Sequence, residues 1–142
     1  MKRLCLLVIF SWIGFAQASQ AQSITKTWQL SLKETIPYLS AEEQQGYKQL
    51  DASMLEMMKK TYEKLRYKFS SGGVLAMVAV TNGVASTMPT AGRWSKSGNQ
   101  LSIWAVGDGA KKKEVFTIVK LTNRVLVLQP SNGSKIAFVA MD

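Results

Sequence analysis

LRYKFS-SGG-VLAMVAV-TNG, residues 65–83, opens a series of seven short apolar segments that decides the fold of this chain. The complete series is LRYKFS (65–70), VLAMVAV (74–80), VASTMPTAGRWS (84–95), QLSIWAVG (100–107), EVFTIVKL (114–121), RVLVLQ (124–129) and SKIAFVAM (134–141). Residues typical of turns, chiefly glycine, asparagine and serine, separate the segments. Strands of this length joined by tight turns usually pair with their neighbours in the sequence. The sequence therefore predicts an antiparallel β-sandwich or β-barrel.

Two positions in the series also predict local backbone geometry. Asn82-Gly83 accepts the positive φ values of a type I′ turn, so it predicts a two-residue hairpin between residues 74–80 and 84–95. Pro89 has no backbone N–H to donate to a sheet, so we expect the strand to bend or bulge there.

Two further elements precede the seven segments. Residues 24–32 (ITKTWQLSL) alternate apolar and polar side chains, which predicts a first strand anchored in the core by Trp28. Ser40 and Glu43 have the spacing of a capping box, and apolar residues then recur every three or four positions. This pattern predicts one α-helix over residues 41–63, with an apolar, methionine-rich face that covers one end of the sheet structure.

The first 21 residues have the pattern of a secretory signal peptide. Lys2 and Arg3 precede an apolar run over residues 4–15, and small residues allow cleavage after Ala18 or Ala21. The run is too short for a membrane span, so we do not expect an integral membrane protein. The prediction is a signal peptide over residues 1–21, a single domain over residues 22–142, and export to the periplasm or the extracellular space.

The composition excludes most catalytic machinery. The sequence contains no histidine, and Cys5, its one cysteine, lies in the predicted signal peptide. These absences remove the usual general base, the thiolate nucleophile and the commonest transition-metal ligands. No pair of carboxylates is placed by the pattern on adjacent inward positions of a strand, as glycoside hydrolysis would need. We therefore expect no catalytic residues, no metal site, no cofactor and no disulfide.

The charge of the chain is strongly positive. The formal net charge is +9, and without Lys2 and Arg3 the 16 basic and 9 acidic residues leave +7. Such a charge suits nucleic acid, anionic lipid or an acidic envelope polymer. The basic residues are scattered along the chain apart from Lys111–Lys113, so solubility in an anionic cell envelope explains them more simply. Nucleic acid is not expected, because Tyr67, Phe69 and Phe138 occupy core positions of the predicted strands and the chain is predicted to be exported. The pattern does not decide whether Trp94 and Trp104 face the core. We expect a monomer.

One further set of segments resembles a known family. The chain places a first strand with Trp28 before a helix, then YKF-SSGG, GRW-SKSGNQLSI around Trp94, FTIVKLTNRVLVLQ, and a last strand ending in AFVAMD. This order resembles the lipocalin-like domain proteins exported by Bacteroidetes. The resemblance implies an eight-stranded antiparallel up-and-down barrel with one α-helix inserted between the first and second strands. Unlike true lipocalins, the chain carries its Gly-x-Trp motif in mid-chain and not in the first strand.

Two functional hypotheses follow from such a barrel, since eight strands enclose an interior that side chains can fill or that can hold one small ligand. In the first, suggested by the resemblance, the barrel binds a small hydrophobic molecule through Tyr67, Phe69, Met77, Trp94, Trp104 and Phe138. In the second, the interior is packed, and the outer surface around Arg93, Lys96 and Lys111–Lys113 contacts an envelope protein or polymer. An apolar cavity of a few hundred Å³, roughly the size of known ligand sites, distinguishes the two.

Overall fold

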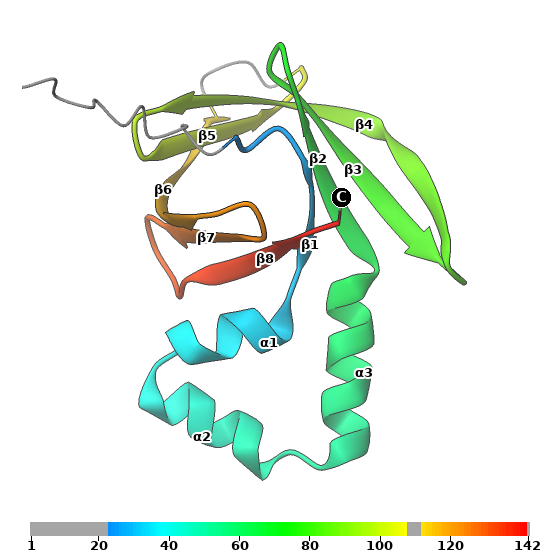
Figure 1. The fold of residues 1–142 in the computed structure, drawn as a ribbon, viewed down its shortest axis with the longest axis vertical. Helices are drawn as coiled ribbons and strands as arrows, with labels where there is room; N and C mark the ends of the chain where they lie inside the picture. The colour runs from blue at the N-terminus through cyan, green and yellow to red at the C-terminus, as the bar shows by residue number, and fades with distance from the viewer. Residues whose placement is uncertain (1–22, 108–111, 142) are drawn as a thin grey trace, which may run out of the picture.

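Eight antiparallel strands close into a barrel in chain order in the computed structural model, which describes residues 23–107 and 112–141 (Figure 1). The strands are β1 (Thr27–Leu30), β2 (Leu65–Ser70), β3 (Val74–Thr81), β4 (Val84–Ser97), β5 (Gln100–Ala105), β6 (Glu114–Leu121), β7 (Val125–Pro130) and β8 (Ile136–Ala140). The first strand pairs with the last, with Trp28 opposite Ala140 and Leu30 opposite Phe138. This closure confirms the predicted eight-stranded antiparallel barrel. The predicted signal peptide lies outside the described residues.

The two local backbone predictions in the β3–β4 hairpin are confirmed. Asn82 and Gly83 have φ values of 52° and 77°, as a type I′ turn requires. Further along, Val78 pairs with Thr87 but Ala76 pairs with Ala91, so the register shifts around Pro89. The missing N–H of proline explains why the extra residues of this bulge are accommodated there.

The prediction of one helix over residues 41–63 is corrected by the structure. The segment forms α2 (Ala41–Gln49) and α3 (Ala52–Glu63), separated by extended backbone at Leu50 and Asp51. The Asp51 carboxylate accepts a hydrogen bond from the Met54 amide at 2.8 Å, and so caps a new helix inside the predicted one. The capping box at the start of α2 is present, with the Ser40 amide donating to Glu43 at 2.9 Å.

Two short helical turns precede α2 and were not predicted. They are α1 (Leu32–Thr35) and a 3₁₀ turn (Ile36–Tyr38). The Thr35 hydroxyl donates to the Ser31 carbonyl at 2.6 Å and accepts from the Ala137 amide of β8 at 3.0 Å. These hydrogen bonds fasten α1 to the barrel wall.

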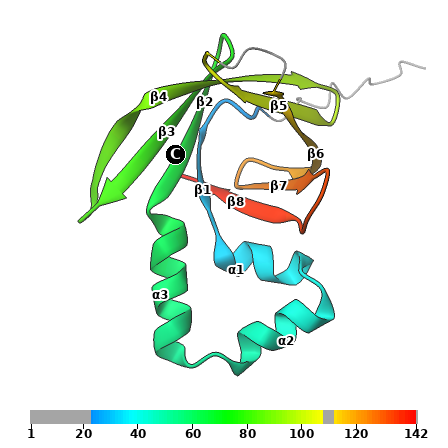
Figure 2. The same cartoon turned by 180° about the vertical axis from the view of Figure 1, so that it is seen from behind.

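The helices gather at one end of the barrel, where α2 and α3 extend away from it (Figures 1 and 2). Leu32 and Thr35 of α1 are buried, whereas no residue of α2 or α3 is. The methionine-rich face of the predicted helix is therefore accessible to solvent, and Met54 and Met57 are exposed. The short α1 packs against β8, whereas α3 touches β1 and β2 without any fully buried residue. No helix in the described part of the chain is long and apolar enough to span a membrane.

The core of the barrel centres on Trp28. Its side chain is fully buried, and its indole N–H donates to the Ile24 carbonyl at 2.9 Å. Around it pack Ile24, which precedes β1, and buried apolar side chains of β2, β3, β5 and β7, namely Phe69, Leu75, Leu101, Leu126 and Leu128. Each such side chain stabilises the fold by about 1.5–3 kcal/mol through removal of apolar surface from water. Side chains fill the part of the barrel interior around Trp28. A cavity can therefore lie only in the part away from this cluster.

Candidate functional site

The barrel contains a cavity of about 530 Å³. Its wall is built from alternate residues of β2, β3, β6, β7 and β8, because successive side chains of a strand point to opposite faces of the sheet. Gly92 of β4 and the consecutive residues 103–105 of β5 complete it. The lining residues are Tyr67, Phe69, Leu75, Met77, Gly92, Ile103, Trp104, Ala105, Lys112, Glu114, Phe116, Leu126, Leu128, Ile136 and Phe138. The lining is therefore predominantly apolar and aromatic.

The floor of the cavity is shared with the core. Phe69, Leu75, Leu126 and Leu128 belong both to the buried cluster around Trp28 and to the cavity lining. These side chains are held by packing on their far side, so the floor is a rigid apolar surface. The interior is thus filled at one end and hollow at the other.

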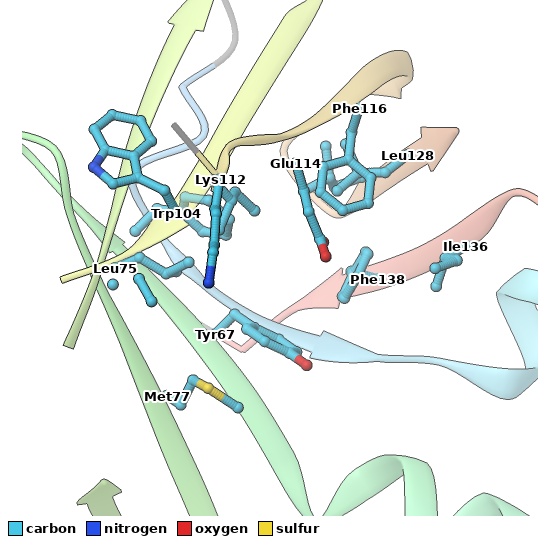
Figure 3. Close-up of a pocket in the computed structure, with 15 residues that line it drawn as sticks. Tyr67, Leu75, Met77, Trp104, Lys112, Glu114, Phe116, Leu128, Ile136 and Phe138 are labelled. Atoms are coloured by element: carbon cyan, nitrogen blue, oxygen red, sulfur yellow. The ribbon is translucent and has the colours of Figure 1, made fainter. Parts of the chain in front are cut away.

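Three polar side chains interrupt the apolar lining. Lys112 and Glu114 are exposed to solvent and mark the mouth of the cavity, and Tyr67 is half-buried opposite them. Figure 3 shows the Lys112 ammonium and the Glu114 carboxylate reaching from one side of the cavity toward Tyr67. The mouth therefore offers a cation, an anion and a hydroxyl to the polar end of a bound molecule.

Burial raises the pKa of the Tyr67 hydroxyl above its ordinary value of 10.0. The group consequently stays protonated at neutral pH, and it can both donate and accept a hydrogen bond. Within the described residues the hydroxyl has no hydrogen-bond partner, while its ring packs edge-to-face against Phe138 at a centroid distance of 5.9 Å. The ring is fixed by packing and the hydroxyl remains available.

The structure brings five of the six sequence-predicted ligand residues to one cavity. Tyr67, Phe69, Met77 and Phe138 lie on its wall, and Trp104 lies at its edge. In Figure 3 the Trp104 ring is turned away from the other labelled side chains. Contact of these five residues with a ligand stays a prediction.

The sixth residue, Trp94, does not line the cavity. Its indole N–H donates to the Ser70 carbonyl at 3.0 Å and to the Val74 carbonyl at 3.1 Å. Its ring packs edge-to-face on Phe69, with the centroids 5.6 Å apart. Trp94 therefore ties β4 to the turn between β2 and β3, which is a structural role.

The basic residues of the second hypothesis are only partly brought together. Lys111 lies outside the described residues, and Lys112 belongs to the cavity mouth. The Lys113 ammonium sits 4.5 Å from the centroid of the Trp104 ring, an attractive cation–π contact. Arg93 pairs with Trp104 across β4 and β5. Lys96 pairs with Leu101 on the same two strands. Among the described basic residues of this set, Lys112 alone lines the cavity.

Several lining residues were missed in the sequence. Leu75 was not assigned to the interior, although its two-residue spacing to Met77 places both on the same face of β3. Glu114 and Phe116 share a face of β6 for the same reason. Strict alternation along these two segments would have found them. The described residues contain no group of three or more histidine, cysteine or acidic side chains able to hold a metal ion.

The match to a protein-family model agrees with this architecture. A family model described as a lipocalin-like domain matches residues 24–128. Among solved structures, a lipocalin-like protein from Bacteroides uniformis is 20% identical, with a TM-score of 0.44 over 56% of this chain and 80% of that one. An uncharacterized protein from Bacteroides eggerthii is 15% identical, with a TM-score of 0.45 over 55% of this chain and 82% of that one. A search of curated proteins found no significant match.

Proposed function

Because the chain belongs to the lipocalin-like domain family, we propose that it binds a small, mostly apolar molecule in the cavity of its barrel. The observation that carries this proposal is the cavity itself. Its volume of about 530 Å³ lies inside the range of roughly 300–1,000 Å³ that is typical of small-molecule sites.

An unfilled apolar interior has a thermodynamic cost. Filling the space with one more large apolar side chain would stabilise the protein by about 1.5–3 kcal/mol. In this barrel, side chains fill the interior around Trp28, and the cavity occupies the rest. A bound molecule that covers the exposed apolar wall recovers this stabilisation when it binds.

The chemistry of the mouth defines the bound molecule further. Its apolar part would lie against Phe69, Leu75 and Phe116, and its polar end against Tyr67, Lys112 and Glu114. A molecule with a hydroxyl, carbonyl or amide group at one end suits this set, since the three side chains can both donate and accept hydrogen bonds. The proposed ligand is therefore amphipathic and small.

The alternative function, surface binding by a fully packed barrel, is less well supported. It requires a filled interior, whereas the cavity described above supports an internal ligand. We also propose that the protein is exported and acts without catalysis, on the grounds of its signal-like first 21 residues and its lack of histidine.

Titration with the neutral fluorescent probe N-phenyl-1-naphthylamine tests the proposal. The protein should enhance the fluorescence of the probe saturably, with one site per chain. Met77→Trp, which places a larger side chain on the cavity wall, should weaken probe binding by at least roughly tenfold, equivalent to about 1.4 kcal/mol.

Val74→Trp is the matched control, because Val74 lies on the same strand but is exposed on the outer face. It should bind the probe as the unchanged protein does. Equal probe binding by both variants would show that the probe binds elsewhere and would count against the cavity as the site.

A further inference from the structure

The β3–β4 hairpin ends in an arm that projects from the barrel beside α3 (Figure 1). We call residues 78–88 the hairpin arm. Over its length β4 pairs with β3, but β4 pairs with β5 only from Gly92 to Ser97. Among the described residues no strand pairs with the other edge of Val84–Met88. The arm therefore presents an open sheet edge.

Over Val84–Met88 this edge lacks the charged residues that commonly protect an edge against pairing with another strand. Natural proteins place charged residues, above all lysine, on exposed edges. Here residues 69–92 contain no charged side chain at all, in a chain whose formal net charge is +9. Val84 is 68% exposed and Met88 is 37% exposed. The arm is thus the uncharged and partly apolar part of a basic protein.

The hairpin turn determines which backbone groups point outward. In a two-residue hairpin the flanking residues, here Thr81 and Val84, form a hydrogen-bonded pair. Because this pattern alternates along the strand, the N–H and C=O groups of Ala85 and Thr87 point away from β3. Pro89 follows Met88 and has no N–H to donate, so the edge that can pair with another strand ends before it.

We propose that this edge pairs with the same edge of a second copy of the chain, in antiparallel orientation about a two-fold axis at Ser86. This register sets Ala85 of each copy opposite Thr87 of its partner, so that outward-facing backbone groups meet. It also sets each Val84 opposite the other copy's Met88 on one face of the joined sheet. The two exposed apolar side chains of the edge would therefore cover one another.

Other registers use the edge less well. An axis at Thr87 would place Pro89 opposite Ala85, which removes hydrogen-bond donors from the seam. An axis at Ala85 would draw the Asn82-Gly83 turn into the pairing and leave Met88 without an apolar partner. Since only about five residues of each chain take part, the interface is small and its affinity is weak. We expect dimers that form reversibly as the protein concentration rises.

Cysteine crosslinking tests the register directly. The chain is produced in full with Cys5→Ser, so that an introduced thiol is its only one. Opposed residues of a non-hydrogen-bonded antiparallel pair have Cα atoms about 4.5 Å apart, within the range that a disulfide spans. Ser86→Cys should therefore give a covalent dimer on mild oxidation.

Val84→Cys is the control, because Val84 is on the same edge and is also exposed. In the proposed register the two introduced thiols would lie four residues from each other, about 13 Å apart along the strand. It should crosslink at least roughly tenfold more slowly, since a disulfide cannot bridge that distance. Equal crosslinking of the two variants, or none with Ser86→Cys, would overturn the proposed pairing.

Sedimentation equilibrium supplies a readout without cysteine. The unchanged protein should shift from monomer toward dimer with rising concentration, and Ser86→Lys should abolish the shift by opposing two like charges. Thr81→Lys is the control. It adds the same charge to the hairpin arm, but on β3 and not on the exposed edge of β4, so this variant should still dimerise. A protein that stays monomeric at every concentration would refute self-association, and would leave the edge to a strand of another protein.

Discussion

The rings of Tyr67 and Phe138 meet edge-to-face across the cavity wall, with their centroids 5.9 Å apart and their planes at 90°. One ring comes from β2 and the other from β8, which are the two strands that flank β1. The contact therefore holds the wall together at the point where the barrel closes.

Phe138→Ala should destabilise the protein by about 2–3 kcal/mol, since it removes the aromatic contact and enlarges the cavity. Urea unfolding followed by tryptophan fluorescence measures this change. Val119→Ala, at an exposed position of β6, should stay within about 0.5 kcal/mol of the unchanged protein. A similar small effect of Phe138→Ala would mean that this wall contributes little to stability.

Tyr67 should lower the stability of the protein as the pH rises into the alkaline range. Burial raises the pKa of its hydroxyl, so its contribution is fully present below the unfolded pKa near 10. The contribution is lost as the pH rises through the higher folded pKa. The free energy of unfolding should therefore fall less between pH 8 and pH 11 in Tyr67→Phe than in the unchanged protein. An equal fall in the two proteins would mean that the Tyr67 hydroxyl does not contribute to the loss of stability at high pH.

Most of the barrel could be predicted from the sequence because its strands are short and its turns are explicit. Residues 65–70 and 114–121 form strands with the predicted bounds, and Asn82-Gly83 forms the predicted turn. Local chemistry decides these elements, since turn residues and alternation act over a few positions. The position of Pro89 likewise predicted the bulge.

The helical segment could not be predicted as well, because two signals competed there. The apolar spacing continues through Leu50 and Asp51, but the aspartate caps α3 and interrupts the helix. Ser31 and Glu34 also have the spacing of a helix start, yet the predicted first strand runs through Ser31 to Leu32. The hydrogen bonds of Thr35 to β8 favour the helical turn α1. Because Thr35 and β8 are far apart in the sequence, no local sequence pattern indicates this contact.

The sequence did not decide between a cavity and a packed interior, and it gave only part of the cavity lining. Alternation placed aromatic residues on one face of each strand, yet it could not show that Trp94 turns toward Ser70. It could not place Lys112 at the mouth either, since that residue precedes β6 in a turn-like run of lysines. Such positions depend on how the barrel closes.

Gly73 should tolerate substitution less than its neighbour Gly72. Both have positive φ, 82° and 89°, so alanine is strained at either position by about 1–2 kcal/mol. A Cβ at Gly73 would also lie 3.0 Å from the Trp94 carbonyl oxygen, whereas at Gly72 it would meet nothing within 4 Å. Gly73→Ala should therefore show the lower unfolding midpoint in urea. Equal midpoints would indicate that β4 shifts easily away from this turn.

Glu43 makes the start of α2 sensitive to acid. The Ser40 amide, the Ser40 hydroxyl and the Ser134 hydroxyl hold the pKa of this carboxyl below its ordinary value of 4.5. Its stabilising effect is therefore present above that value and is lost as the pH falls through the lowered pKa. Circular dichroism should show less helix in Glu43→Gln than in the unchanged protein at pH 7, and no difference once the carboxyl is protonated. A difference that persists in strong acid would assign the effect to something other than charge.

The most direct test of the central claim is mass spectrometry of small molecules extracted from the protein after purification from its native host. An internal binding site predicts one class of small amphipathic molecule, present at about one per chain and depleted in the Met77→Trp variant. The Val74→Trp variant should retain it. Repeated purification without any bound molecule, or equal retention by the two variants, would contradict a ligand held inside the barrel.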